Sequence, residues 1–132
     1  MNEFEITKLF KENKFRATPQ RIAIYKYLCE NRTHPDAEEI YKSVVQIRPS
    51  FSKTTVYNAL QALENKGLII KINIDENRVR YDAFTGLHGH FICKKCNKIY
   101  DFDVQSIIAN INSSFDVDKK DVYYRGICPE CK

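Results

Sequence analysis

Two pairs of cysteines constrain this chain more than any other feature. Cys93 and Cys96 form one pair in "CKKC", and Cys128 and Cys131 form another in "CPEC". Together they offer four thiolates, which is the closed tetrahedral ligand set of structural zinc. The 31 residues between the pairs, 97–127, are more than a compact zinc ribbon uses and can hold a strand, a helix and a strand. A zinc ion here would tie the end of a domain to its beginning.

The rest of the composition predicts a reducing environment for these thiols. The N-terminal residues show no basic stretch followed by an apolar one, so we expect no secretion signal. No apolar run approaches the length of a membrane span. We therefore predict a cytoplasmic protein that does not enter the membrane, in which cysteines serve as ligands rather than in disulfides. The fifth, Cys29, falls on an apolar helical stripe and is predicted to be a buried, inert thiol.

The first part of the chain has the pattern of a winged helix-turn-helix. A short amphipathic helix is expected in "EFEITKLFKENKF", and Thr18 with Pro19 begins a second. Asp36 and Glu39 have capping-box spacing, and the clearest helix follows Ser52. After Gly67 the pattern alternates, with a turn-like "DEN" at 75–77, which predicts a hairpin. Three of these helices followed by the hairpin make a winged helix-turn-helix.

The second part of the chain restarts at about residue 88. Strands are predicted in "HFIC", "KIYDFDV" and "DVYYRGIC", and a helix in "QSIIANINSSF", residues 105–115. This α/β piece is too small to be stable alone, so a metal, a partner subunit or both should support it. The predicted fold is α+β, with domains at 1–83 and 88–132 joined by a hinge at 84–87, "FTGL".

A basic excess accompanies the predicted winged helix. Residues 1–81 hold 14 Lys and Arg against 10 Asp and Glu, whereas residues 82–132 hold 7 of each kind. The helix after Ser52 would turn a polar face to the major groove of DNA: Lys53, Thr54, Thr55, Tyr57, Asn58 and Gln61. Flanking candidates for phosphate contacts are Arg16, Arg21, Lys71, Arg78 and Arg80. The plainer alternative is a solvated helix face, which the hairpin and the charge asymmetry make less attractive.

A second metal site is suggested by "HGH". His88 and His90 lie two residues apart, so on a strand they point to one face and can chelate one ion. Along the same strand, Cys93 would point to the opposite face, which favours a site separate from the thiolates. Carboxylates are available nearby in sequence at Asp82, Asp101 and Asp103. Imidazole nitrogens and carboxylate oxygens suit Fe(II), Mn(II) or Zn(II). Two histidines on a strand are also often ordinary surface residues, and the local pattern does not decide between these readings.

Together, "RATPQR", "HPDAEEIY", "SKTTVYNALQALENKGLI", "RYD", "HGHFICKKCNKIYDF" and "CPEC" resemble the ferric uptake regulator family over nearly the entire chain. The resemblance implies a homodimeric, metal-responsive repressor of double-stranded DNA operators, with residues 88–132 as the dimerisation domain and no enzymatic role. It assigns the structural zinc to Cys93, Cys96, Cys128 and Cys131. It assigns a regulatory ion to His34, Asp82, His88, His90 and Asp101, and leaves Asp103 without a metal role.

Within the family this chain is most similar to the peroxide-responsive branch, which carries Asp at the positions of both Asp82 and Asp101. That resemblance implies a regulatory Fe(II) or Mn(II), hydrogen peroxide as the signal, and oxidation of His34 or His88 when iron is bound. Gly89 replaces a larger residue of the family, which predicts a more mobile loop.

Three alternatives remain at this stage. The nearest is an iron- or manganese-responsive repressor of the same family that does not sense peroxide. Another is a zinc hydrolase built on His88 and His90, which lacks an evident general base in the sequence. The third is a zinc-ribbon adaptor that binds another protein, for which His34 would be irrelevant.

Overall fold

The computed structural model describes residues 1–75, 78–83, 88–104, 107, 109–118 and 120–132, with the backbone alone for 73–75 and 88. The chain divides into two compact units, Met1–Thr85 and Gly86–Lys132. The predicted hinge, 84–87, lies outside the described residues, and the predicted domain bounds stay predictions. Among the described helices, none is long and apolar enough to cross a bilayer.

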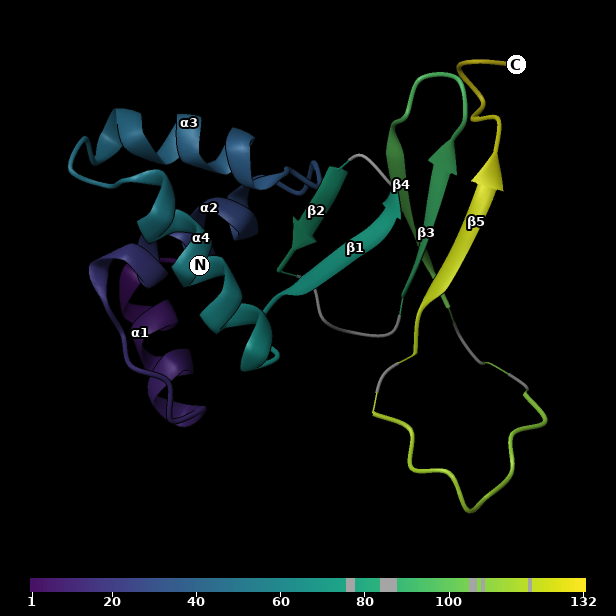
Figure 1. Ribbon diagram of the computed structural model, residues 1–132, viewed down its shortest axis with the longest axis horizontal. Helices are drawn as coiled ribbons and strands as arrows, with labels where there is room; N and C mark the ends of the chain where they lie inside the picture. The colour runs from purple at the N-terminus through teal and green to yellow at the C-terminus, as the bar shows by residue number, and fades with distance from the viewer. Residues whose placement is uncertain (76–77, 84–87, 105–106, 108, 119) are drawn as a thin grey trace. The chain divides into compact units, whose positions relative to one another are not determined.

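Unit 1 begins with four helices, α1 (Glu3–Glu12), α2 (Pro19–Glu30), α3 (Ala37–Ile47) and α4 (Lys53–Asn65), shown in Figure 1. Side chains cap all four. The backbone N–H of Arg21 donates to Thr18 Oγ1 at 3.2 Å, and the N–H of Thr55 donates to Ser52 Oγ at 3.1 Å. Capping boxes begin α1 and α3, the latter at Asp36 as predicted.

Helix α4 ends at a Schellman motif formed around a glycine. Gly67 has a φ of +78°, which costs glycine little. Its N–H donates to the Glu64 carbonyl at 2.9 Å, and that of Leu68 donates to the Leu63 carbonyl at 3.0 Å. The chain then enters a hairpin of β1 (Ile70–Asp75) and β2 (Arg78–Asp82), which pair antiparallel. The four helices and this wing confirm the winged helix-turn-helix prediction.

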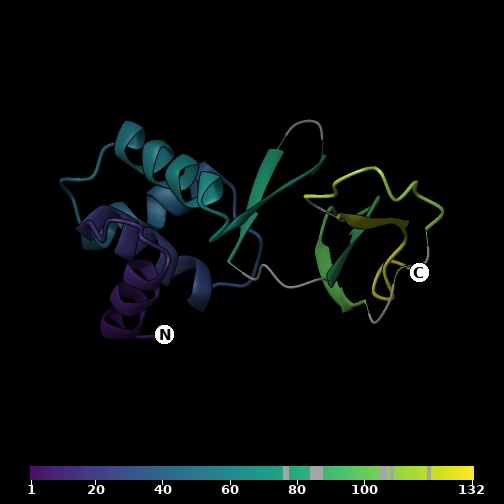
Figure 2. The same ribbon diagram turned by 90° about the horizontal axis from the view of Figure 1, so that it is seen from below.

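The core of unit 1 lies among the helices (Figure 2). Val56, Leu60 and Leu63 of α4 are buried. In α2 the buried positions are Ile24, Tyr25 and Leu28, whereas Ile22 and Cys29 are half-buried. Other core side chains come from the remaining helices and the start of the wing: Ile6, Phe10, Ile40, Val44 and Ile69.

Unit 2 is built on a three-stranded sheet in the order β4-β3-β5. The central strand β3 (His88–Cys93) pairs antiparallel with β4 (Ile99–Asp103) and parallel with β5 (Val122–Gly126). Gly89 is therefore a strand residue paired on both sides, and the prediction of a mobile loop there is wrong. A Cβ at Gly89 would fall inside the ring of Phe102, its partner on β4, so the missing side chain makes room for that ring.

The predicted helix over 105–115 is wrong for the described part of that segment. Residues 107 and 109–115 adopt no helix, as the irregular path in Figure 1 shows, while 105, 106 and 108 lie outside the described residues. Ile107, Ile111 and Phe115 are 41%, 57% and 64% exposed. Within one chain the apolar face of such a helix has nothing to pack against, and short helices are marginal without packing.

Candidate metal centres and nucleic-acid interface

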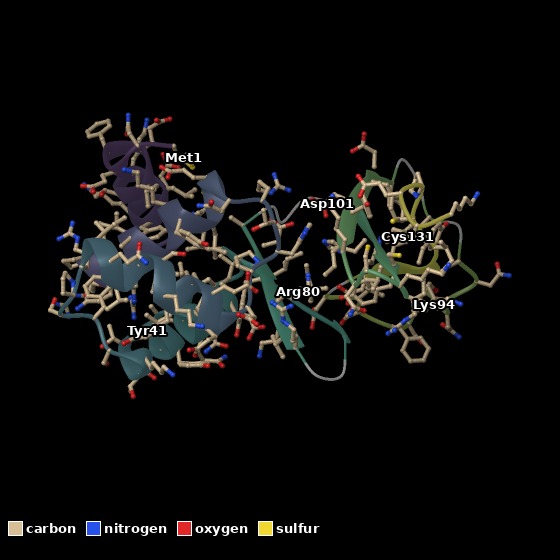
Figure 3. All side chains as sticks on the ribbon, turned by 90° about the horizontal axis from the view of Figure 1, so that it is seen from above. Met1, Tyr41, Arg80, Lys94, Asp101 and Cys131 are labelled. Carbon is tan, nitrogen blue, oxygen red and sulfur yellow. The ribbon has the colours of Figure 1, made fainter. Side chains whose placement is uncertain are left out.

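The four cysteines of the two pairs meet at one end of the sheet of unit 2. Parallel pairing places Cys93, at the end of β3, beside Gly126 of β5, and each strand then continues into a tight turn. The N–H of Lys94 donates to the Gly126 carbonyl at 2.8 Å and fixes this register. As a result, one Sγ from each of the four cysteines lies within 4.8 Å of the others. Asp101 on β4 and Cys131 in the second turn are labelled in Figure 3.

The backbone around the cysteines favours thiolate at Cys93. The N–H groups of Cys128 and Cys96 point at Cys93 Sγ, at 3.4 and 3.5 Å, and these hydrogen bonds lower the pKa of Cys93 to about 6. Hydrogen bonds with Cys128 and Cys93 raise the pKa of Cys131 to about 12. Four thiols this close could all ionise only around a cation, and an all-sulfur tetrahedral set fits structural zinc. Cys29 stands apart in unit 1 as a half-buried thiol whose pKa burial raises.

In unit 1, His34 and Asp82 form a buried imidazole–carboxylate pair. Both side chains are almost fully buried, and His34 Nε2 lies 3.6 Å from Asp82 Oδ2. The Tyr81 N–H donates to the Pro35 carbonyl at 3.0 Å, and an isolated bridge joins Asp36 to Arg80. These contacts hold the segment before α3 against strand β2.

The backbone of His34 is left-handed, with a φ of +57°. For a residue other than glycine this conformation costs on the order of 1 kcal/mol, and such residues concentrate at functional sites. The two groups of the pair provide one nitrogen and one oxygen, a donor set that fits Fe(II), Mn(II) or Zn(II).

Unit 2 carries an imidazole–carboxylate pair of the same kind. His90 of β3 and Asp101 of β4 are cross-strand partners, and His90 Nε2 lies 3.4 Å from Asp101 Oδ1. His90 is buried, while the side chain of Asp101 is 28% exposed. For His88 the structure describes the backbone in β3 and not the side chain. Asp103 is exposed on β4.

The exposed face of α4 matches the predicted DNA-reading face at most positions. Lys53, Thr54, Tyr57, Asn58 and Gln61 are exposed. Thr55 is only half-exposed, and its N–H and hydroxyl both meet Ser52 Oγ at the N-cap.

Several cations predicted to contact phosphate are already engaged within unit 1. Arg78 donates to Asp36 at 2.9 Å and also to Glu39, so it fastens the wing to the start of α3. Arg21 donates to the Arg16 carbonyl at 3.1 Å, and Lys71 lies 3.5 Å from Glu64.

Two arginines differ from what sequence reasoning gave. Arg80, a predicted candidate for a phosphate contact, is only 7% exposed, and its burial argues against that role. Alternation along β2 sends Arg80 to the same side as Asp82, which could have indicated this. Arg32 was not predicted to take part in any site, yet its Nε lies 3.1 Å from Asp82 Oδ1. Nothing local in the sequence marks that contact, because 50 positions separate the two residues.

Comparison with known proteins gives a consistent result. The sequence model of the ferric uptake regulator family matches residues 12–131. The peroxide-responsive repressor PerR of Staphylococcus epidermidis is 36% identical over 123 residues, which cover 89% of this chain and 81% of that protein. The peroxide operon regulator of Bacillus subtilis is 35% identical over 133 residues, covering 96% and 91%.

Solved structures agree with the sequence comparison. The structure of PerR from Streptococcus pyogenes, described as a basis for peroxide sensing and gene regulation, is 29% identical, with a TM-score of 0.56 and coverage of 98% of this chain and 92% of that one. The Helicobacter pylori ferric uptake regulator is 24% identical, with a TM-score of 0.71 and coverage of 98% and 91%, and supports the fold alone.

Proposed function

Because this chain belongs to the ferric uptake regulator family, we propose that it is a metal-dependent, DNA-binding transcriptional repressor that responds to hydrogen peroxide. The observation that carries the proposal is that each unit holds one buried histidine facing one carboxylate, His34 with Asp82 and His90 with Asp101. Neither pair alone is a full ligand set. With His88 they make three nitrogens and two oxygens.

One regulatory ion bound by both pairs would fix the arrangement of the two units. In a homodimer that arrangement sets the separation of two α4 helices, which must match half-sites about 34 Å apart, one turn of the duplex. The ion would therefore favour the DNA-binding arrangement by the difference between its affinities for the two arrangements. The structural zinc at the four cysteines keeps unit 2 folded throughout.

The exposed side chains of α4 would read the operator. Asn58 and Gln61 can bond adenine, while Thr54 and Tyr57 can contact thymine methyl groups or phosphate. Arg16, exposed on the same unit, is suited to phosphate, whereas Lys53 would reach DNA only by leaving Glu38, 3.3 Å away, and Arg78 only by leaving Asp36 and Glu39.

The names of the two relatives described above, from Staphylococcus epidermidis and Bacillus subtilis, support peroxide as the signal. A bound Fe(II) would supply the redox chemistry by which one oxygen atom of hydrogen peroxide is transferred to a ligand imidazole and the other leaves as water. His34 and His88 are the candidates for oxidation, and an imidazole that has gained an oxygen atom is a poorer ligand. The regulatory ion would then be bound more weakly, and the repressor would dissociate from the operator. Mn(II) would hold the same residues without this reaction.

Peptide mass spectrometry tests the proposal directly. The Fe(II)-loaded and Mn(II)-loaded proteins are exposed to low hydrogen peroxide and digested. We expect one added oxygen on the peptide containing His34 or on that containing His88, in the iron form only. Binding to duplexes selected from a random pool with Mn(II) should be lost in parallel. An iron form that keeps both histidines unmodified while still binding DNA would indicate an iron- or manganese-responsive repressor instead.

A further inference from the structure

Arg32 contacts the proposed ligand of unit 1 from outside the ligand set. It lies in the segment between α2 and α3, and its Nε is 3.1 Å from Asp82 Oδ1. The carboxylate is 1% exposed, while the arginine side chain is 44% exposed. A buried carboxylate thus has a counter-charge at the edge of the solvent.

The two oxygens of Asp82 face different groups. Oδ1 faces the guanidinium of Arg32, and Oδ2 faces His34 Nε2 at 3.6 Å. Arg32 and His34 come from the same short segment, which the Tyr81–Pro35 hydrogen bond holds against β2. One oxygen is therefore committed to the arginine, and the other is directed to the side where the imidazole lies.

We propose that Arg32 is a positioning residue that neutralises Asp82 in the metal-free protein and thereby lowers the affinity of the regulatory site for a divalent ion; this rests on the proposed function. A dication at Oδ2 would take over the neutralisation of the carboxylate and repel the guanidinium. The ion pair thus stabilises the metal-free form more than the metal-bound form. Whatever favours the unliganded form weakens binding by the same free energy.

The size of the effect follows from the exposure of Arg32. A pair with one partner this exposed is screened by solvent and contributes modestly. Removing the charge should tighten Mn(II) binding roughly fivefold, the upper range for such a pair. The arginine would in this way set the metal concentration at which the repressor responds.

Three variants of the full zinc-containing chain separate this role from a merely structural one: Arg32→Met, Arg32→Lys and, as a matched control, Arg48→Met. The control removes the same charge from an exposed position at the end of α3. Two quantities are measured, namely the Mn(II) dissociation constant from the free-ion paramagnetic resonance signal, and the melting temperature without and with saturating Mn(II).

For Arg32→Met we expect tighter Mn(II) binding, a lower melting temperature without Mn(II), and a larger gain on adding it. Arg32→Lys should restore wild-type values in part, and Arg48→Met should match wild type. Weaker or unchanged Mn(II) binding by Arg32→Met would overturn the inference, because an arginine that only shapes the site would lose affinity when removed. If Arg32→Met does not fold, Arg32→Lys must still show the intermediate shift. Failure of the proposed function looks different: wild type and His34→Ala would then bind Mn(II) equally.

Discussion

The four cysteines and the histidine–carboxylate pairs differ in how completely one unit holds them. All four sulfurs belong to unit 2 and lie within 4.8 Å of each other. The proposed regulatory ligands are divided, with His34 and Asp82 in unit 1 and His90 and Asp101 in unit 2. A ligand group that lies entirely in one unit, such as the four cysteines, can stabilise that unit but does not depend on the position of the other unit. A ligand group with members in both units, such as the proposed regulatory ligands, would bind its ion with all members in only one arrangement of the two units. The binding free energy could therefore select that arrangement.

The donor atoms of the two ligand groups also suit different roles. Four thiolates close the coordination of zinc and suit an ion that stays. Nitrogen and oxygen donors discriminate less among Mn(II), Fe(II) and Zn(II), and their affinity is more open to adjustment by neighbours such as Arg32. The first group suits structure and the second suits regulation.

The largest expected effect, on zinc binding and on the folding of unit 2, comes from removing one of the four cysteines. Cys93→Ser should abolish zinc binding and unfold unit 2, because structural zinc in small domains contributes on the order of 10 kcal/mol of apparent binding free energy. Zinc content by mass spectrometry and the near-ultraviolet circular dichroism of the tyrosines on β4 and β5 measure this. Cys29→Ser is the control and should keep both signals. A folded, zinc-free Cys93→Ser protein would show that the thiolates do not hold the unit together.

Next in size is the effect of removing one ligand from either half of the divided group. His34→Ala and His90→Ala lie in different units, yet each should weaken Mn(II)-dependent DNA binding to a similar extent, about 100-fold, the range over which loss of support at a metal site commonly weakens it. Zinc content should stay at the wild-type level in both. Fluorescence anisotropy with a selected duplex, with and without Mn(II), gives the comparison. A large loss from one variant and none from the other would mean that one unit binds the ion alone.

A smaller effect on Mn(II) affinity is expected from crowding the strands that carry the unit 2 pair, without replacing a ligand. The Cβ of Gly89→Ala must displace the ring of Phe102, which packs on Tyr124 with a centroid separation of 4.9 Å. Such overpacking costs about 1–3 kcal/mol, and it disturbs the strands that pair His90 with Asp101.

Mn(II) affinity should therefore fall in Gly89→Ala while zinc content is kept. The double variant Gly89→Ala with Phe102→Ala should recover part of the affinity, because the second change returns the space. Equal Mn(II) binding by wild type and Gly89→Ala would show that the register of β3 and β4 tolerates the change.

Short-range chemistry explains what the sequence predicted well. Thr18, Asp36, Ser52 and Gly67 act on backbone groups within a few residues, and each lies where the helix ends require. The spacing of the cysteines likewise predicted a four-sulfur group, because two tight turns can each deliver two thiols. The fold class followed from these local rules and from the change of period after Gly67.

Long-range contacts explain what the sequence did not predict. The ion pair of Arg32 with Asp82 and the burial of Arg80 arise only when the segment before α3 lies against β2. His34 shows no local pattern of a ligand and was assigned through family resemblance alone. The incorrect prediction of a helix over 105–115 has a different cause. Its apolar residues have helical spacing, but a helix whose apolar side chains are exposed has no packing to stabilise it.

The smallest expected effect tests how firmly the unit 1 pair is supported. Asp36→Asn keeps an N-cap for α3 but removes the charge that faces Arg78. Burial raises the pKa of Asp36, but the Glu39 N–H and the Arg78 guanidinium outweigh it, so the pKa is lowered from 3.8. A carboxyl with a lowered pKa in the folded state stabilises the fold above its unfolded value and loses that contribution as the pH falls through the folded value.

At neutral pH, Asp36→Asn should therefore reduce the unfolding free energy of unit 1 by less than about 1 kcal/mol, since Arg78 is 41% exposed. The difference from wild type should shrink as the pH falls below 3.8. Urea unfolding followed by far-ultraviolet circular dichroism, at neutral pH and below this value, measures both numbers. A difference that persists at acid pH would trace the loss to the cap and not to the charge.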